Sequence, residues 1–200
     1  MSDTTSSSPG GAEARKAARL RDRLRAETRA EHEALDAGFA NMLAPGARSL
    51  YACFLLTNRA GHEAVEPLLE RSPLGWTGGG RLAALRADCR AMGLPRLRPP
   101  RLASDLPALP EAVGAAYVLE GSRLGAAFLL KALRRDPASS LPVRYLEASS
   151  DPEPFRQVIA LANATPWSEA EMDRAVASAN QTFRTFRALA EGARIRMTIS

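Results

Sequence analysis

The fold is decided by one long apolar stretch, EAVGAAYVLEGSRLGAAFLLKALRR, which covers residues 111–135. Alanine and leucine dominate it, and these side chains lose little conformational entropy in a helix. Pro110 stands just before the stretch, where proline suits the first turn of a helix. The chain shows no alternation of apolar and polar residues of the kind that indicates strands. We therefore predict an all-α protein in which this stretch forms one long helix.

Apolar residues with a helical period extend this prediction to both sides of the stretch. The sequence Ser168-x-x-Glu171 is a capping box, which predicts the start of a last helix at that point. Five prolines between residues 93 and 110 indicate an irregular connection. Residues 136–142, DPASSLP, are predicted to be a loop, and residues 143–151 stay unassigned. The further helices are expected over residues 13–37, 47–70, 81–92, 152–162 and 168–192.

The chain has the size and composition of one ordinary globular domain. It has 200 residues, of which 46% are hydrophobic. Residues 1–11 are rich in Ser, Thr and Gly, so we predict a disordered tail followed by one domain over residues 12–200. The net charge of +5 is spread along the chain without a basic block or nucleic-acid motif, and we infer no nucleic-acid binding. We also expect no membrane span and no signal peptide.

Two cysteines bear on the compartment. Cys53 and Cys89 belong to no CxxC motif, and both lie in helical, mostly apolar segments. We predict that they are buried free thiols, as expected in a reducing cytoplasm.

The glycines of the long stretch are its most unusual feature. Gly121 and Gly125 are four residues apart and therefore lie on one face of a helix, although each costs about 0.5–1 kcal/mol relative to alanine. A face without side chains allows a flat ligand to approach the backbone, or a second helix to pack closely. The polar residues Glu120, Ser122 and Arg123 exclude a version of this helix embedded in lipid.

Only two histidines are available for any imidazole chemistry. His32 falls at the edge of the apolar stripe of the first predicted helix, where it is either a surface residue or directed into a pocket between helices. A neutral imidazole is a good ligand for heme iron when its second nitrogen has a partner. Asp36, one turn later, is placed to be that partner. His62 is a weaker candidate, and no spacing supports a metal site that uses both histidines.

The segment around the first histidine resembles a motif of the heme oxygenases, particularly the bacterial enzymes that supply biliverdin to phytochromes. In that family a first-helix histidine is the proximal iron ligand. A threonine lies four residues before this histidine, and basic residues lie three and seven residues before it. A carboxylate often lies four residues after it. This chain matches with Arg25, Thr28, Arg29, His32 and Asp36.

The glycine-bearing segment, YVLEGSRLG, resembles the distal helix of the same family, in which glycine backbone lies over the heme face. Gly121 and Gly125 match that helix, and residues 180–189, NQTFRTFRAL, resemble the last helix of the family. The resemblance covers about residues 15–189. It implies a single-domain, multi-helix bundle like that of heme oxygenases.

The resemblance implies that heme is both cofactor and substrate, and that O2 and external electrons open it to biliverdin, CO and ferrous iron. An electron donor such as a ferredoxin or a reductase, and a bacteriophytochrome that accepts biliverdin, are the implied partners. The catalytic segment would be Gly121, Ser122 and Gly125, with His32 as iron ligand and Asp36 behind it. The residues expected to contact the rest of the heme, its propionates above all, are Arg25, Thr28, Arg29, Tyr117 and, as the nearest match for a later basic residue, Arg156.

Two departures from the family affect the distal side. Many members have a second glycine where this chain has Ala126, and Ser122 stands near the place of an aspartate that orders water in animal members. These differences bear on the rate and on the ring carbon that is cleaved. Three alternatives stay open: a non-enzymatic heme carrier on the same scaffold, a helical thiamin-type hydrolase that would need Cys53 or Cys89 to be reactive, and a partner-binding protein without a small ligand.

Overall fold

The computed structural model describes residues 19–44, 46–100, 108–136 and 139–199. Helices account for nearly all regular structure in these ranges, and no strand occurs in them, so the all-α prediction is confirmed. The predicted disordered tail, residues 1–11, lies outside the described residues. The helices are α1 (Leu20–Glu27), α2 (Arg29–Ala37), α3 (Arg48–Glu70), α4 (Arg81–Ala91), α5 (Leu109–Leu133), α6 (Arg144–Ala148), α7 (Glu153–Ala164) and α8 (Glu169–Ile199).

The first predicted helix is divided in two at Thr28. The Thr28 hydroxyl donates a hydrogen bond to the carbonyl of Leu24 at 2.7 Å, which competes with the backbone ladder and bends the helix. Thr28 has φ −104° and ψ −2°, away from regular helical values, so α1 ends before it and α2 begins after it. The prediction of one continuous helix was therefore wrong at this residue.

The last helix begins at the predicted capping box and runs further than predicted. The Ser168 hydroxyl accepts from the backbone N–H of Glu171, whose carboxylate accepts from the N–H of Ser168 at 2.8 Å. We expected an end near Gly192, but α8 continues to Ile199. Ala193, just beyond that glycine, is fully buried against Cys53 and Leu56 of α3, so packing against α3 extends the helix.

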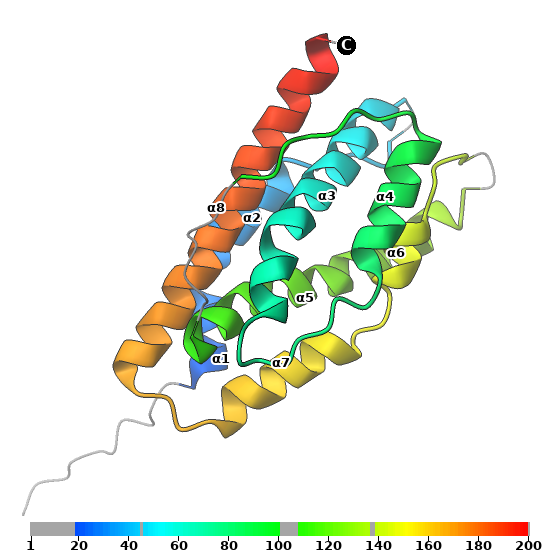
Figure 1. Ribbon diagram of the computed structural model, residues 1–200. Coiled ribbons are helices and arrows are strands. Elements are labelled where there is room, and N and C mark those ends of the chain that lie inside the picture. Colours follow the sequence, from blue (N-terminus) through cyan, green and yellow to red (C-terminus); the bar gives the residue numbers. More distant parts are fainter. Residues whose placement is uncertain (1–18, 45, 101–107, 137–138, 200) are drawn as a thin grey trace, which may run out of the picture.

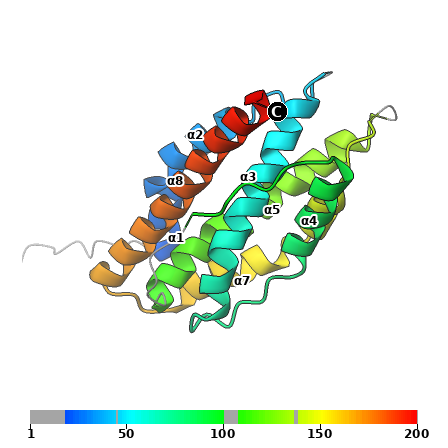
Figure 2. The same cartoon turned by 45° about the horizontal axis from the view of Figure 1, so that its top comes forward.

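Helix α5 is the centre of the bundle. Its first half packs on α7 and on α8, which also contacts α1, α2 and α3 along its length, while its second half shares a core cluster with α4 and α6 (Figures 1 and 2). A large core cluster joins α5 to α1, α3, α7 and α8. A second cluster joins its far end to α3, α4 and α6. Both cysteines are buried and free, as predicted.

Helix α5 is also, within the described part of the chain, the one helix whose length and composition would suit a membrane crossing. Half of the relevant window is buried inside the protein. Its Glu120 and Arg123 are almost completely buried and form an ion pair with each other. These features are those of a core helix of a globular protein.

Candidate functional site

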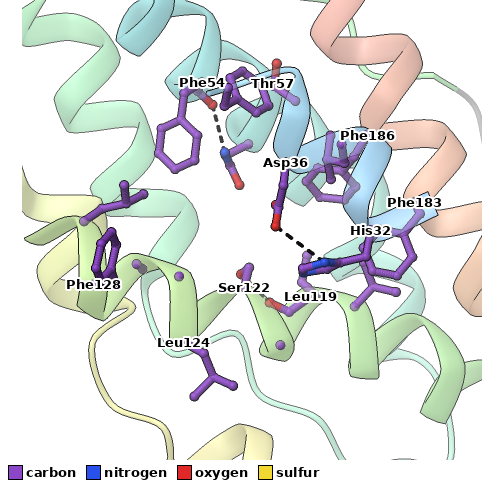
Figure 3. A pocket seen from close by; sticks show the side chains of 18 of the residues that line it. His32, Asp36, Phe54, Thr57, Leu119, Ser122, Leu124, Phe128, Phe183 and Phe186 are labelled. Atoms are coloured by element: carbon purple, nitrogen blue, oxygen red, sulfur yellow. Dashed lines mark hydrogen bonds and ion pairs between the residues drawn. The ribbon is translucent and has the colours of Figure 1, made fainter. Parts of the chain in front are cut away.

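A cavity of about 530 Å³ opens between α2, α3, α5 and α8. Its volume lies within the usual range for small-molecule sites, and most of the lining side chains are apolar. Six of the ten residues predicted for the site line this cavity: His32, Asp36, Tyr117, Gly121, Ser122 and Gly125. The two motifs, about ninety residues apart in the sequence, therefore meet at one place (Figure 3).

The α2 wall presents an imidazole. The His32 ring packs edge-on against Phe183 of α8, with the ring centroids 5.6 Å apart. Its Nδ1 lies 3.4 Å from a carboxylate oxygen of Asp36, one turn further along α2 (Figure 3). The side chains of His32 and Asp36 are 58% and 68% exposed, because the cavity is open on this side. With Nδ1 directed at Asp36, Nε2 is the ring nitrogen available to a ligand.

The α5 wall presents backbone. A Cβ atom built on Gly125 would meet no atom within 4 Å, and one built on Gly121 would meet only the ring of Phe155, at 3.5 Å. Neither glycine is therefore needed for close packing between helices. The absent side chains leave room in the cavity for a ligand to approach the helix.

Ser122 lies on the same wall, but its hydroxyl is already engaged. It donates to the carbonyl of Leu119 at 2.7 Å and accepts from the Arg81 guanidinium at 3.4 Å. Ala126 also borders the cavity while packing into the core beyond it. Ser122 and Ala126 are the two residues that differ from the pattern of the resembled family, and their effect on activity remains a prediction.

The remaining four predicted residues do not line the cavity. Thr28 is buried, with its hydroxyl bonded to Leu24. Arg29 pairs with Glu33 at 2.6 Å on the exposed side of α2.

The two other arginines also lie outside the cavity lining. Arg156 pairs with Glu153 at 3.3 Å on the surface of α7. Arg25 lies close enough to Tyr117 to lower the pKa of its phenol, although burial has the larger effect and raises it. Arg25 is thus near the Tyr117 end of the cavity, and the roles of all three arginines stay predictions.

Behind α5 lies a buried polar network that the sequence did not reveal. Arg81, from the start of α4, is fully buried and donates to Glu120 at 2.6 Å and to the Leu119 carbonyl at 2.9 Å. Glu120 also accepts from Trp76 at 2.7 Å and from Arg123. The signal that was available is the pair Glu120 and Arg123, three residues apart within an otherwise apolar helix.

The network reaches the cavity through side chains from α3 and α6. Tyr145 and Asn58 border the cavity, and the phenol donates to the Asn58 amide oxygen at 2.9 Å. Thr57 borders it too, and its buried hydroxyl has no hydrogen-bond partner among the described residues. His62 lies one layer deeper, fully buried and bonded to Glu66, so it is not on the cavity wall.

These residues fit a heme. The cavity is large and apolar, with one imidazole on the α2 wall and a glycine backbone on the α5 wall. An apolar slot with a few polar groups and one histidine is the donor set that holds heme in proteins.

Comparison with known proteins agrees with this geometry. No protein-family model matches the chain. A heme oxygenase from Xanthomonas campestris pv. campestris (strain 8004) is 36% identical over 116 residues, which are 56% of this chain and 68% of that protein. The solved structure of the NO- and CO-bound heme oxygenase from Neisseria meningitidis superposes with a TM-score of 0.62 at 23% identity, over 88% of this chain and 92% of that one.

The structural likeness defines the class of protein, a helical bundle with the heme oxygenase fold. The sequence likeness to the Xanthomonas protein goes further: the chain belongs to the heme oxygenase family, whose members are oxidoreductases. This confirms the family that the two motifs predicted.

Proposed function

We propose that the protein holds heme in this cavity with His32 as the axial ligand and opens the ring to biliverdin, CO and ferrous iron. Dioxygen is the co-substrate, and an external donor supplies the electrons. The observation that supports this most directly is that His32 and the glycine pair Gly121 and Gly125 lie on opposite walls of one apolar cavity. Bound heme would supply the redox-active iron at which dioxygen reacts.

The α2 wall would provide the histidine ligand of the heme iron and fix its orientation. Asp36, 3.4 Å from Nδ1 of His32, would accept the proton on that nitrogen, which would fix the tautomer and leave Nε2 as the nitrogen directed to iron. Phe183 supports the ring from behind and limits its rotation. A neutral imidazole donates less electron density to iron than a thiolate does.

The α5 wall would set the space for dioxygen. At Gly121 and Gly125 the helix presents no side chain, so the backbone limits how a small molecule can tilt above the ring. The polar groups near this wall are the hydroxyls of Ser122 and Tyr145 and the amide of Asn58. They can orient water and hold a proton close to the reacting oxygen.

The rim of the cavity would select the orientation of the ring, and with it the carbon that is cleaved. We propose that Tyr117 and Arg25 at one end contact the propionates, with Arg29, Thr28 and Arg156 contributing to the same binding. This proposal is supported by the effect of Arg25 on the Tyr117 phenol.

The physiological setting follows from the same resemblance. We propose a ferredoxin or reductase as electron donor, a bacteriophytochrome as acceptor of biliverdin, and a cytoplasmic location. Two buried free thiols are consistent with a reducing compartment.

Hemin titration of the purified protein, followed by ascorbate or a ferredoxin system in air, tests this function. The wild type should give a histidine-ligated ferric spectrum and then the absorbance of biliverdin. We expect His32→Ala to lose that spectrum and at least about 100-fold in turnover, because the only imidazole on the cavity wall is gone. His62→Gln is the matched control and should keep the ferric spectrum.

Each other outcome has a clear meaning. Heme uptake without biliverdin in the wild type would support the carrier alternative and contradict the enzymatic proposal. A ferric spectrum that persists in His32→Ala but disappears in His62→Gln would move the ligand to α3. No Soret band on titration would contradict heme binding altogether.

A further inference from the structure

The buried network contains two titratable groups that the proposed function does not use, His62 and Glu66, and they connect to Tyr145, which it does use. His62 Nδ1 lies 2.7 Å from the Glu66 carboxyl, one turn along α3. On the other side of the same ring, Nε2 lies 3.5 Å from the phenol oxygen of Tyr145 on α6, which is the longest link. The three side chains therefore form a continuous row of proton donors and acceptors across the interior.

One end of this row is at the cavity. Tyr145 borders the cavity together with Asn58 and Ser122, and its phenol already donates to the Asn58 amide. Burial raises the pKa of this phenol, and the nearby hydroxyls of Ser122 and Ser149 lower it by a smaller amount. The Tyr145 hydroxyl is thus the point where the row meets the distal side of the cavity.

The other end is close to the surface. Glu66 Oε2 lies 3.4 Å from the position that a Cβ on Gly78 would occupy. Gly78, Gly79 and Gly80 form the loop before α4, so backbone without side chains lies beside the carboxyl, next to the ring of Trp76. The Glu66 side chain is 7% exposed to solvent, whereas the His62 side chain is fully buried.

We propose that Glu66, His62 and Tyr145 are a proton-entry chain that connects solvent beneath the Gly78–Gly80 loop to the distal side of the cavity. The inference rests on the proposed function, because reduction of dioxygen at the heme takes up protons on the distal side of the cavity. The protons would thus enter from the α3–α4 side, away from the open α2 side of the cavity.

The transfer balances in single-proton steps. The Glu66 carboxyl gives its proton to His62 Nδ1, and the Nε2 proton of the same ring passes to the Tyr145 oxygen. The phenol proton leaves Tyr145 for the acceptor in the cavity. The ring is left with its proton on Nδ1, so it must return to the Nε2–H tautomer before Glu66, reprotonated by solvent, can donate again. One proton has then crossed, and no electron has moved.

The surroundings of His62 keep its ring neutral and able to accept a proton at one nitrogen. Burial holds the pKa of His62 well below its usual range. The positive charges of Arg81 and Arg123 lower it further, and Glu120 opposes them. A neutral ring has one N–H and one bare nitrogen, as a relay requires.

The surroundings of Glu66 allow it to gain and lose a proton near neutral pH. Burial raises the pKa of this carboxyl to about 7, with Glu120 adding to the effect and Arg81 and Arg86 opposing it. A group with a pKa near the working pH is the most effective in proton transfer.

The first test uses the protein without heme. Because the chain has only two histidines, ¹⁵N-histidine NMR resolves His62 and His32 separately. Below about pH 7, His62 should be the Nε2–H tautomer that accepts from protonated Glu66, and above it the Nδ1–H tautomer that donates to the carboxylate. In Glu66→Gln this switch should disappear. A His62 tautomer that is constant from pH 5.5 to 8.5 in the wild type would overturn the proposal.

The second test measures turnover with bound heme. We expect Glu66→Gln and Tyr145→Phe to slow biliverdin formation by about 10-fold or more, with unchanged hemin affinity and a changed pH profile. Glu63→Gln is the matched control, since Glu63 lies one turn away on α3 but pairs with surface arginines, and it should turn over normally. If the wild type turns over heme and Glu66→Gln and Tyr145→Phe are equally fast, the proton-entry chain is refuted and the proposed function is not. If the wild type itself shows no turnover, the proposed function is refuted.

Discussion

Helix α5 carries glycine in both of its halves, and the two halves meet different surroundings. In the first half, a Cβ atom on Gly114 would collide with the carbonyl oxygen of Ala175 on α8. In the second half, a Cβ on Gly125 would meet no atom within 4 Å. The first glycine allows two helices to approach closely, and the second leaves a cavity open.

The halves are also held in place differently. The first half is fixed by apolar packing in the core cluster it shares with α8. The second half has the cavity on one side. It is fixed by the core cluster that its far end shares with α3, α4 and α6, and at the middle of the helix by Arg81, which bonds to the Leu119 carbonyl and to Glu120. A wall that borders a ligand site cannot be stabilised by packing on its open face, and here polar contacts at the middle of the helix add to the packing on its other faces.

The largest effect that tests this comparison is expected from Arg81→Leu. Removing the guanidinium takes away one of the positive charges that pair with the buried Glu120 carboxylate, and it removes the hydrogen bond to the Leu119 carbonyl. We expect a loss of about 3–5 kcal/mol in the free energy of unfolding, measured with urea. Arg86→Leu is the control, because Arg86 is half exposed and Glu63 keeps Arg59 and Arg96 as partners, so the loss should be at most about 1 kcal/mol. Equal losses in the two variants would show that the network does not hold the cavity half of α5.

A smaller effect is expected from Gly114→Ala in the packed half. The new methyl group forces α5 and α8 apart against the backbone of Ala175, and such overpacking costs about 1–3 kcal/mol. Urea unfolding measures the loss. Hemin affinity of the folded variant should change little, since Gly114 does not border the cavity. A stability equal to that of the wild type would contradict the close approach of the two helices.

Much of this arrangement could be predicted from the sequence, because it depends on local patterns. Helical periodicity located the helices, and the capping box located the start of α8. The spacing of four residues placed Asp36 beside His32, and the same spacing placed Gly121 and Gly125 on one face. The role of each glycine could not be predicted, because the partner that Gly114 touches lies about sixty residues later in the chain.

The parts that were missed depend on contacts between distant segments. Tyr145 comes from a five-residue helix that lacks a local signal, and Arg81 follows a glycine-rich loop. They meet Asn58 and Glu120 only because α3, α4, α5 and α6 pack together. The break at Thr28 and the extension of α8 past Gly192 likewise follow from a side-chain hydrogen bond and from packing on α3.

The smallest change in stability, and the sharpest contrast between the halves, is expected from Gly125→Ala. Its methyl group meets nothing in the protein, so the gain in helix propensity should raise the free energy of unfolding by about 0.5–1 kcal/mol. The same methyl group enters the cavity, so hemin affinity should fall while stability rises. Urea unfolding and hemin titration of one preparation measure both. Gly114→Ala should do the reverse. It should lose stability and keep its hemin affinity, because the methyl group there collides with the neighbouring helix α8. If Gly125→Ala lost stability as Gly114→Ala does, the second half of α5 would be packed against protein and could not form the wall of a heme site.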